Sequence, residues 1–348
     1  MKKENLLDLN LEELKQKIKE LGHEPYRAKQ LFEWIYKKNI FDINKYSNIP
    51  QKLKDDLTKN FTIQIPEISH VSHSEKDNSY KFLLKTDDDK LVESILMLKN
   101  DRATICISCM IGCPLACKFC ATGMEVGFVR KLKTSEIIGQ ILAIKSYAKL
   151  HSITDKITNI VFMGMGEPFL NLPAVDRTVG ILISEDGFGM SKSRITISTA
   201  GPTNNIADFI NKHKVKLAVS LHFPTDELRS KYMPVNKNFD LSQLVEELKK
   251  IKLSKREQIT IEYMMLQNIN DSIEHAKQLV RLVSSLKVKI NLIPYNPTKA
   301  LPVKPSDEKT INEFIKYLVS KSVPVTVRRS LGAEIEGACG QFALKKTS

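Results

Sequence analysis

The chain has 348 residues, 42% of them hydrophobic, and a mean hydropathy of −0.22, values typical of a globular protein with one large core and a small accessory domain. With 53 Lys and Arg against 40 Asp and Glu, its formal charge of +13 favours a polyanionic partner such as RNA, although a merely solvated lysine-rich surface is the alternative. The charged N-terminus and the lack of a long apolar run argue against a signal peptide and a membrane protein, and predict a cytoplasmic location.

Residues 1–70 are expected to form a small helical domain that binds RNA. Asn10 is placed to cap a first helix, Pro25 to begin a second, and Gln51–Thr58 has the pattern of a third. Lysine and arginine residues lie on the faces opposite the apolar stripes. A compact basic module suits recognition of RNA shape, and a solvated helix face is the simpler interpretation.

Residues 71–100 contain two strand-like runs, at 80–85 and 91–98, around an aspartate-rich turn. They predict a β-hairpin that links the helical domain to the main domain. Glu93 is an acidic residue inside the second apolar run. The sequence leaves open whether its side chain is exposed on one face of the strand or directed into a site.

Residues 101–330 alternate between strand-like and helical segments. The strands are expected at Thr104–Ile107, Ile157–Met163, Arg194–Thr199, Val215–Leu221, Gln258–Met264, Val288–Ile293 and Val323–Val327. Repeated strand–helix units predict an α/β protein with a parallel sheet, and six units favour a partial (β/α)6 TIM-type barrel over the eight of a closed one. Residues 331–348 would then form a C-terminal tail.

Polar and small residues follow several of these strands, at the edge where barrels carry their chemistry. Gly166 and Glu167 follow the second strand, Ser198 ends the third, His222 follows the fourth and Asn296 the sixth. Each is ordinary loop chemistry when taken alone, and His222 alone is better explained as a hydrogen-bonded core histidine. Together they indicate one mouth surrounded by small polar groups.

Five of the six cysteines lie within a single stretch of fifteen residues, and its centre is Cys113-x-x-x-Cys117-x-x-Cys120. Three thiolates can hold three irons of an iron–sulfur cubane, which leaves the fourth iron open to a small chelating molecule. The alternative is a structural zinc site with Cys106 or Cys109 as its fourth ligand.

The sixth cysteine, Cys339, lies alone in the tail, between small residues that would let it enter a confined mouth. With it, the motifs along the chain resemble the RlmN/Cfr family of radical S-adenosylmethionine (SAM) RNA methyltransferases. The resemblance is carried by Tyr26–Trp34, Cys106–Gly123, Gly127–Leu132, Ser135–Gln140, Met163–Pro168, Ser220–His222, Leu292–Pro297 and Ala338–Gln341. The Gly-Phe-x-Arg and Ser-Glu-Ile-Ile-Gly-Gln stretches look like the RlmN branch, which methylates carbon 2 of adenine, whereas the Cfr branch methylates carbon 8.

The resemblance implies a reaction that uses two SAM molecules and a 4Fe-4S cluster. Cys339 would carry a methyl group from the first SAM, and the cluster, held by Cys113, Cys117 and Cys120, would activate the second. SAM contacts fall by the same resemblance to Gly166, Glu167, Ser198, Ser220, Leu221, His222 and Asn296.

Two further residues take their roles from the resemblance: Glu93 as the proton acceptor, and Cys106 as the resolving cysteine that ends in a disulfide bond. One departure is that Cys109 stands where the family has serine, so this thiol is either an inert packing residue or a competitor of Cys106.

The implied partners are 23S rRNA, tRNA next to its anticodon and an external flavodoxin-type electron donor, and the protein is expected to be a monomer. Two alternatives remain at this point. One is Cfr-like methylation of carbon 8, and the other is a non-enzymatic RNA-binding protein stabilised by zinc or by a cluster.

Overall fold

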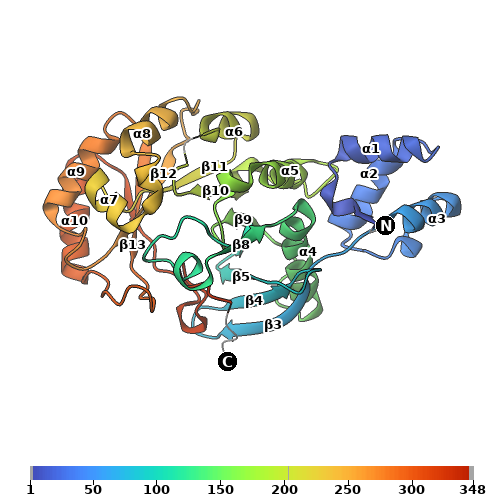
Figure 1. Ribbon diagram of the computed structural model, residues 1–348, viewed down its shortest axis with the longest axis horizontal. Coiled ribbons are helices and arrows are strands. Elements are labelled where there is room, and N and C mark those ends of the chain that lie inside the picture. Colours follow the sequence, from blue (N-terminus) through green and yellow to red (C-terminus); the bar gives the residue numbers. More distant parts are fainter. Residues whose placement is uncertain (1–2, 203, 345–348) are drawn as a thin grey trace.

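The protein is described here by a computed structural model that covers residues 3–202 and 204–344. Its centre is a ten-stranded sheet whose strands follow the order of the chain from β3 at one edge to β14 at the other, while β7 and β8 pair in a separate small sheet (Figure 1). The parallel strands are β6 (Arg102–Cys106), β9 (Asn159–Phe162), β10 (Ile195–Thr199), β11 (Lys216–Ser220), β12 (Ile259–Met265), β13 (Val288–Pro294) and β14 (Val325–Val327). Because β14 does not pair with β3, the barrel is open. The expected partial barrel is confirmed.

Helices connect the parallel strands in each crossover. They are α4 (Thr134–Leu150), α5 (Leu172–Ile183), α6 (Ile206–His213), α7 (Asp226–Tyr232), α8 (Leu241–Lys249), α9 (Ile273–Val283) and α10 (Glu308–Ser320). Short helical turns are η1 (Leu6–Asp8), η2 (Glu33–Lys37), η3 (Ile43–Lys45), η4 (Thr122–Val126), η5 (Pro168–Asn171), η6 (Lys192–Arg194), η7 (Pro234–Lys237) and η8 (Ala333–Ile335). Asp240 caps α8 as its sequence suggests. The helices α5, α6 and α7 were not anticipated.

The three N-terminal helices lie together at one end of the molecule (Figure 1). They are α1 (Leu11–Glu20), α2 (Arg27–Phe32) and α3 (Gln51–Asn60), with the two-residue strands β1 (Glu4–Asn5) and β2 (Phe61–Thr62). Asn10 and Glu13 form the capping box that starts α1. The helices are fixed to the barrel by polar contacts, including the Ser135 amide to Asp8 (2.7 Å) and Arg177 to Glu13 (2.7 Å).

The hairpin expected in residues 71–100 is continuous with the barrel sheet. Its strands are β4 (Ser79–Lys85) and β5 (Leu91–Lys99); β5 also pairs with β6, and β4 pairs with β3 (Glu67–Ser74), which had not been anticipated. All three pairings are antiparallel. The segment therefore extends the wall of the barrel on the side where the parallel strands leave it open.

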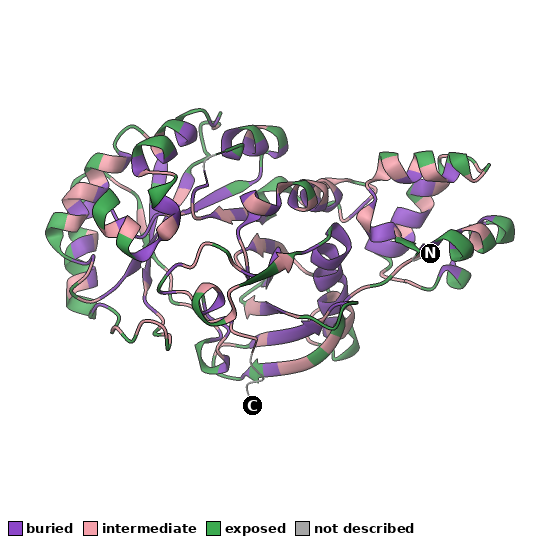
Figure 2. Ribbon diagram, viewed as in Figure 1, coloured by how far each residue is buried: buried purple, intermediate pink, exposed green. Residues whose placement is uncertain are grey.

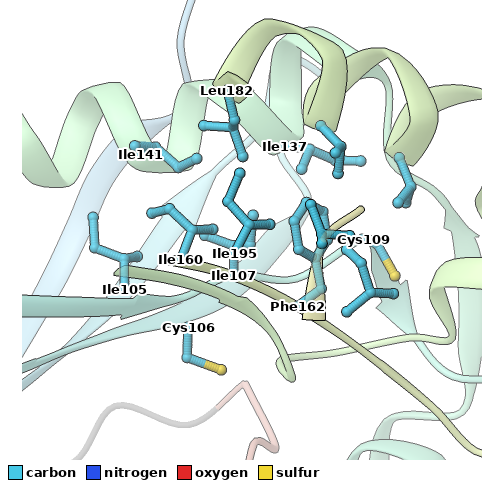
Figure 3. Close-up of a cluster of buried hydrophobic side chains, with 14 of the residues drawn as sticks. Ile105, Cys106, Ile107, Cys109, Ile137, Ile141, Ile160, Phe162, Leu182 and Ile195 are labelled. Carbon is cyan, nitrogen blue, oxygen red and sulfur yellow. The ribbon is translucent and has the colours of Figure 1, made fainter. Parts of the chain in front are cut away.

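The main core lies between the sheet and its helices, and the strands and inward helix faces are buried while the outward helix faces are exposed (Figure 2). Figure 3 shows isoleucine and leucine side chains from β6, β9, β10, α4 and α5 gathered there. Cys106 points to the opposite face of the sheet from its neighbour Ile105 (Figure 3). None of the helices in the described part of the chain is both long and apolar enough to cross a lipid bilayer.

Candidate active site

A cleft opens at the carboxyl ends of the parallel strands. Its lining includes the following residues singled out from the sequence: Cys113, Cys117, Cys120, Gly166, Glu167, Ser198, Ser220, His222, Asn296 and Cys339. Three others, Leu221, Cys106 and Glu93, do not line it.

The loop that carries the three clustered cysteines is shaped by a close approach of two backbone segments. The short strands β7 (Met110–Gly112) and β8 (Phe128–Lys131) form its base, and the Cys113 amide donates to the Gly127 carbonyl at 2.8 Å. Gly112 has φ +74°, and a Cβ atom there would lie 1.6 Å from the same carbonyl oxygen. Only glycine fits at this position, because both the backbone angle and the space exclude a side chain.

Cys117 is buried and Cys113 and Cys120 are partly buried, and withdrawal from solvent raises the pKa of each thiol, to about 12 for Cys113. For Cys117 the neighbouring thiolates raise the pKa further, so three free thiolates would be costly here without a bound cation. Sulfur is a donor that suits iron–sulfur clusters. Three such donors on one loop beside a cleft fit a cluster with an open iron.

The spacing of the donors does not suit a single zinc ion. Zinc binds thiolates at about 2.3 Å in a tetrahedron, which places its sulfur ligands about 3.8 Å apart. Among the described residues, the one group of three or more His, Cys, Asp or Glu side chains with ligand atoms within 4.8 Å of one another is Asp87, Asp88 and Glu136. No three sulfurs of the described cysteines all lie within that distance of one another, so the loop is wider than a zinc tetrahedron.

Glu167 presents a carboxylate to the cleft from the loop after β9. Its Oε1 accepts from the Phe169 amide (3.1 Å) and the Thr199 hydroxyl (2.8 Å), and its Oε2 accepts from the Ala200 amide (2.8 Å). Burial nevertheless raises its pKa to about 7. A cationic ligand group such as an ammonium would stabilise the ionised form. Gly166 precedes it at φ +100°, where a Cβ atom would meet a side-chain carbon of Met110 at 2.6 Å.

His222 also lines the cleft, and it is at the same time a hydrogen-bonded buried histidine. Its Nδ1 accepts from the Met264 amide at 3.2 Å, and its ring meets that of Phe119 edge to face at 5.1 Å. Burial lowers its pKa to about 3, so the imidazole is neutral with its proton on Nε2. The sequence suggested either a hydrogen-bonded core histidine or a residue of the cleft mouth, and His222 is both.

A buried arginine, which the sequence interpretation missed, holds the strand ends behind this part of the cleft. Arg229 of α7 donates to the carbonyls of Leu221 and Ala200 and to the side chain of Asn236. Leu221 takes part in the site through this carbonyl, while its side chain is buried outside the cleft. A surface-like run, Asp-Glu-Leu-Arg, gave no signal that its arginine would be buried.

The C-terminal tail passes over the cysteine loop and places Cys339 in the cleft. The Ala121 amide donates to the Gly340 carbonyl (2.7 Å), and the Thr122 hydroxyl donates to the Phe342 carbonyl (2.8 Å). At its start the tail is fixed to the hairpin, where Asp77 accepts from the Gly332 amide at 2.6 Å. Cys339 is exposed, so its thiol is accessible from the cleft.

Arg328 contacts the Cys339 thiol directly, and it too was missed in the sequence. It follows β14, lines the cleft, and donates from Nη2 to Sγ of Cys339 at 2.9 Å. Asn296, which was anticipated, holds the same residue through its backbone carbonyl at 3.3 Å. The contact holds the sulfur in place within the cleft.

Of the two candidate resolving thiols, Cys106 interacts with Cys339 and Cys109 does not. The Cys106 side chain points to the face of the sheet that the tail covers (Figure 3), and burial together with the nearby Cys339 raises its pKa to about 12. Cys109 is enclosed in the core, and its sulfur faces the Met165 carbonyl at 3.7 Å. Of the two alternatives for Cys109, the structure therefore favours packing.

Glu93 is completely buried beneath the tail. Its Oε2 accepts from the Leu344 amide at 3.1 Å, and its Oε1 lies 3.6 Å from Nζ of Lys81, which is equally buried. Burial raises the pKa of Glu93, and Lys81 opposes this rise. The sequence allowed an exposed side chain or one directed into a site; the structure places it on the inner face of the sheet, outside the cleft lining.

The chain was compared with known proteins. Residues 4–63 match the family model of the ribosomal RNA large subunit methyltransferase N-terminal domain, and residues 107–280 match that of the radical SAM superfamily. Proteins named dual-specificity RNA methyltransferase RlmN are similar over nearly the whole chain. That of Vesicomyosocius okutanii is 40% identical (99% of this chain, 96% of the relative) and that of Lawsonia intracellularis 42% identical (97% and 96%). The crystal structure of a radical SAM methyltransferase from Sphaerobacter thermophilus superimposes with a TM-score of 0.91 at 37% identity, covering 98% of this chain and 100% of that one.

Proposed function

We propose a reaction for this chain from one premise: it belongs to the RlmN family of radical SAM RNA methyltransferases. The reaction is methylation of carbon 2 of adenine, in 23S rRNA and in tRNA next to the anticodon, through a methyl group carried on Cys339. One observation carries this proposal: Cys339 lines the same cleft as the three clustered cysteines. A methyl group on its sulfur would be inside the cofactor cleft.

The chemistry requires a radical because carbon 2 of adenine lies between two ring nitrogens and is too electron-poor to attack the methyl group of SAM. Bound together, a 4Fe-4S cluster and SAM would supply the radical that takes a hydrogen atom from the methyl group on Cys339, and the cluster would later take back one electron. Cys113, Cys117 and Cys120 would hold the cluster. The residues proposed to bind SAM are Gly166, Glu167, Ser198, Ser220, Leu221, His222 and Asn296.

Cys339 would act first as a nucleophile. Its thiolate attacks the methyl carbon of SAM, so that a sulfur–carbon bond forms and the electron pair of the broken bond stays on S-adenosylhomocysteine. The contact from Arg328 supports this step, because it holds the sulfur in place within the cleft. After loss of a hydrogen atom, the methylene carbon bonds to carbon 2 of adenine, and the RNA is linked to Cys339.

Glu93 and Cys106 would then release the product. The Glu93 carboxylate takes the proton from carbon 2, and the electron pair of that bond stays with the ring. The Cys106 thiolate attacks the sulfur of Cys339, which forms a disulfide and breaks the sulfur–carbon bond. The electron pair goes to the methylene carbon, which takes up a proton and becomes the new methyl group. A reductant must then restore the two thiols.

The basic character of the chain supports an RNA partner, because +13 charges favour binding to phosphate backbones. The N-terminal helices would hold the RNA, while the target adenine is turned out of its stack to reach the cleft. An external flavodoxin-type protein would donate the electrons. We propose that the enzyme acts as a monomer.

The test begins with anaerobic reconstitution by iron and sulfide, followed by exposure to SAM and mass spectrometry of the peptide that contains Cys339. The proposal expects a methyl group on Cys339 that is lost on turnover with RNA. RNA digested to nucleosides should then contain 2-methyladenosine.

Other outcomes would overturn specific parts. A product of 8-methyladenosine would place the chain with Cfr-like enzymes. A cluster that cleaves SAM beside an unmodified Cys339 would remove the S-methylcysteine route. A protein that binds zinc, or a cluster indifferent to SAM, would leave only the RNA-binding alternative.

A further inference from the structure

Lys81 and Glu93 form a buried ion pair on the inner face of the sheet. In the register of β4, β5 and β6, Ile95 lies opposite both Lys81 and Cys106, and Glu93 lies opposite Leu83. Residues opposite one another in antiparallel strands point to the same face, as do residues two apart on one strand. Lys81, Glu93 and Cys106 therefore face the same side of the sheet, the side that the tail covers.

The pair is unusual because it is fully withdrawn from solvent. Lys81 is 2% exposed and Glu93 is 0% exposed, and their charged atoms are 3.6 Å apart. Burying two charges costs desolvation free energy that their attraction does not reliably repay, so apolar residues of similar size would stabilise the sheet as well or better. A role in stability alone does not explain the pair.

The two oxygens of Glu93 are held from different parts of the molecule. The amide on Oε2 belongs to Leu344 in the tail, whereas Lys81 faces Oε1 from the neighbouring strand of the sheet. The tail also carries Cys339, to which the RNA would be linked. The contact between Lys81 and Glu93 lies within the sheet and does not depend on where the tail lies. It is therefore suited to keep the Glu93 carboxylate in place while RNA is linked to Cys339 on the tail.

We propose that Lys81 is a positioning residue of the reaction, which fixes Glu93 and keeps it as a carboxylate so that it can accept the proton from carbon 2 of adenine. The proposal rests on the function proposed above. In this step the carbon–hydrogen bond breaks, an oxygen–hydrogen bond forms on Glu93, and the electron pair stays in the adenine ring. Lys81 keeps its own proton throughout.

The electrostatics agree with this role. Burial raises the pKa of Glu93, and the Lys81 charge is the largest influence that lowers it again. Without the ammonium, the pKa of the buried carboxyl group would rise further, and its neutral form could not take up a proton. Each unit by which its pKa exceeds the pH of the assay lowers the carboxylate fraction about tenfold.

The experiment uses the full-length reconstituted enzyme with Lys81→Met, Lys81→Arg and Glu93→Gln variants. Three quantities are measured: S-methylation of Cys339, the covalent RNA–protein adduct on a denaturing gel, and methylated adenosine in the RNA. We expect Lys81→Met to methylate Cys339 normally and to form the adduct, which then accumulates as in Glu93→Gln. Release of methylated RNA should fall about tenfold or more. Lys81→Arg, which keeps the charge, should restore release.

A purely structural role predicts a different pattern, since a disturbed fold would reduce S-methylation, adduct and product together, and that result would overturn the proposal. So would a Lys81→Met enzyme that releases product at the unaltered rate. If Lys81→Met fails to fold, Lys81→Gln provides the test, because its amide can hydrogen-bond to Glu93 without charge; adduct accumulation is again expected, and normal release would refute the role. Failure of the Lys81 proposal can be distinguished from failure of the proposed function. If the proposed function is wrong, the unaltered enzyme itself forms neither S-methylcysteine nor adduct.

Discussion

Replacing Gly112 by alanine should prevent assembly of the cysteine loop. At φ +74° an L-residue costs about 1–2 kcal/mol. The new Cβ would also lie 1.6 Å from the Gly127 carbonyl oxygen, so the two strands must separate and the hydrogen bond from the Cys113 amide is lost, which costs about 0.5–1.5 kcal/mol more. The loop should therefore be destabilised by about 1.5–3.5 kcal/mol, before any strain in the strands is added.

Gly127→Ala is a matched control from the same loop. Gly127 has φ +71°, but a Cβ atom there would meet nothing within 4 Å. This variant carries a backbone penalty of its own, because φ +71° with ψ −160° strongly favours glycine, and it adds no overlap. Iron and sulfide per chain after reconstitution, together with thermal unfolding, measure both variants. We expect Gly112→Ala to bind little iron and Gly127→Ala to bind most of it. Equal iron content and equal unfolding temperatures would refute the argument that close packing at Gly112 shapes the loop.

Three further predictions concern the reaction and the RNA. Cys106→Ala should accumulate the RNA adduct on Cys339, whereas Cys109→Ala should release product at nearly the unaltered rate; adduct in both variants would show that Cys109 also resolves it. Release from the adduct should accelerate about tenfold per pH unit between pH 7 and 9, because burial raises the pKa of Cys106 to about 12 and its thiolate fraction rises tenfold per unit below that value. A rapid-quench pH series measures this, and a flat profile would mean that another step limits release. RNA affinity, measured by filter binding, should fall steeply with salt, and a constant affinity across a tenfold range would contradict phosphate binding.

Much of the fold followed from local patterns. The alternation of strands and helices after residue 101 predicts the parallel sheet, because each buried strand is a continuous apolar run that is recognisable by itself. The capping residues Asn10 and Asp240 mark helix starts for the same local reason. The short helices α6 and α7 were missed, since they depend on packing against the sheet more than on a long periodic stripe. The longer helix α5 was missed as well.

The candidate active site could be predicted from local sequence patterns only in part. The clustered cysteines could be found because their spacing is itself the signal. Arg328, Arg229 and Lys81 have ordinary neighbours in the sequence, and a lone basic residue is by default exposed. These side chains are buried or form contacts because segments far apart in the sequence pack together. The hydrogen bond from the Leu344 amide to Glu93, for example, joins residues 251 positions apart. No local pattern encodes such a meeting.

The path of the tail also bears on how the enzyme matures. Thr122 beside the clustered cysteines holds Phe342, which the ribosome adds 220 residues later. During synthesis the three thiols therefore emerge long before the segment that covers them, and iron can reach them while the mouth is still uncovered. Docking of the tail would then seal a finished centre and bring the methyl-carrying sulfur to it, so the order of residues along the chain doubles as an order of assembly.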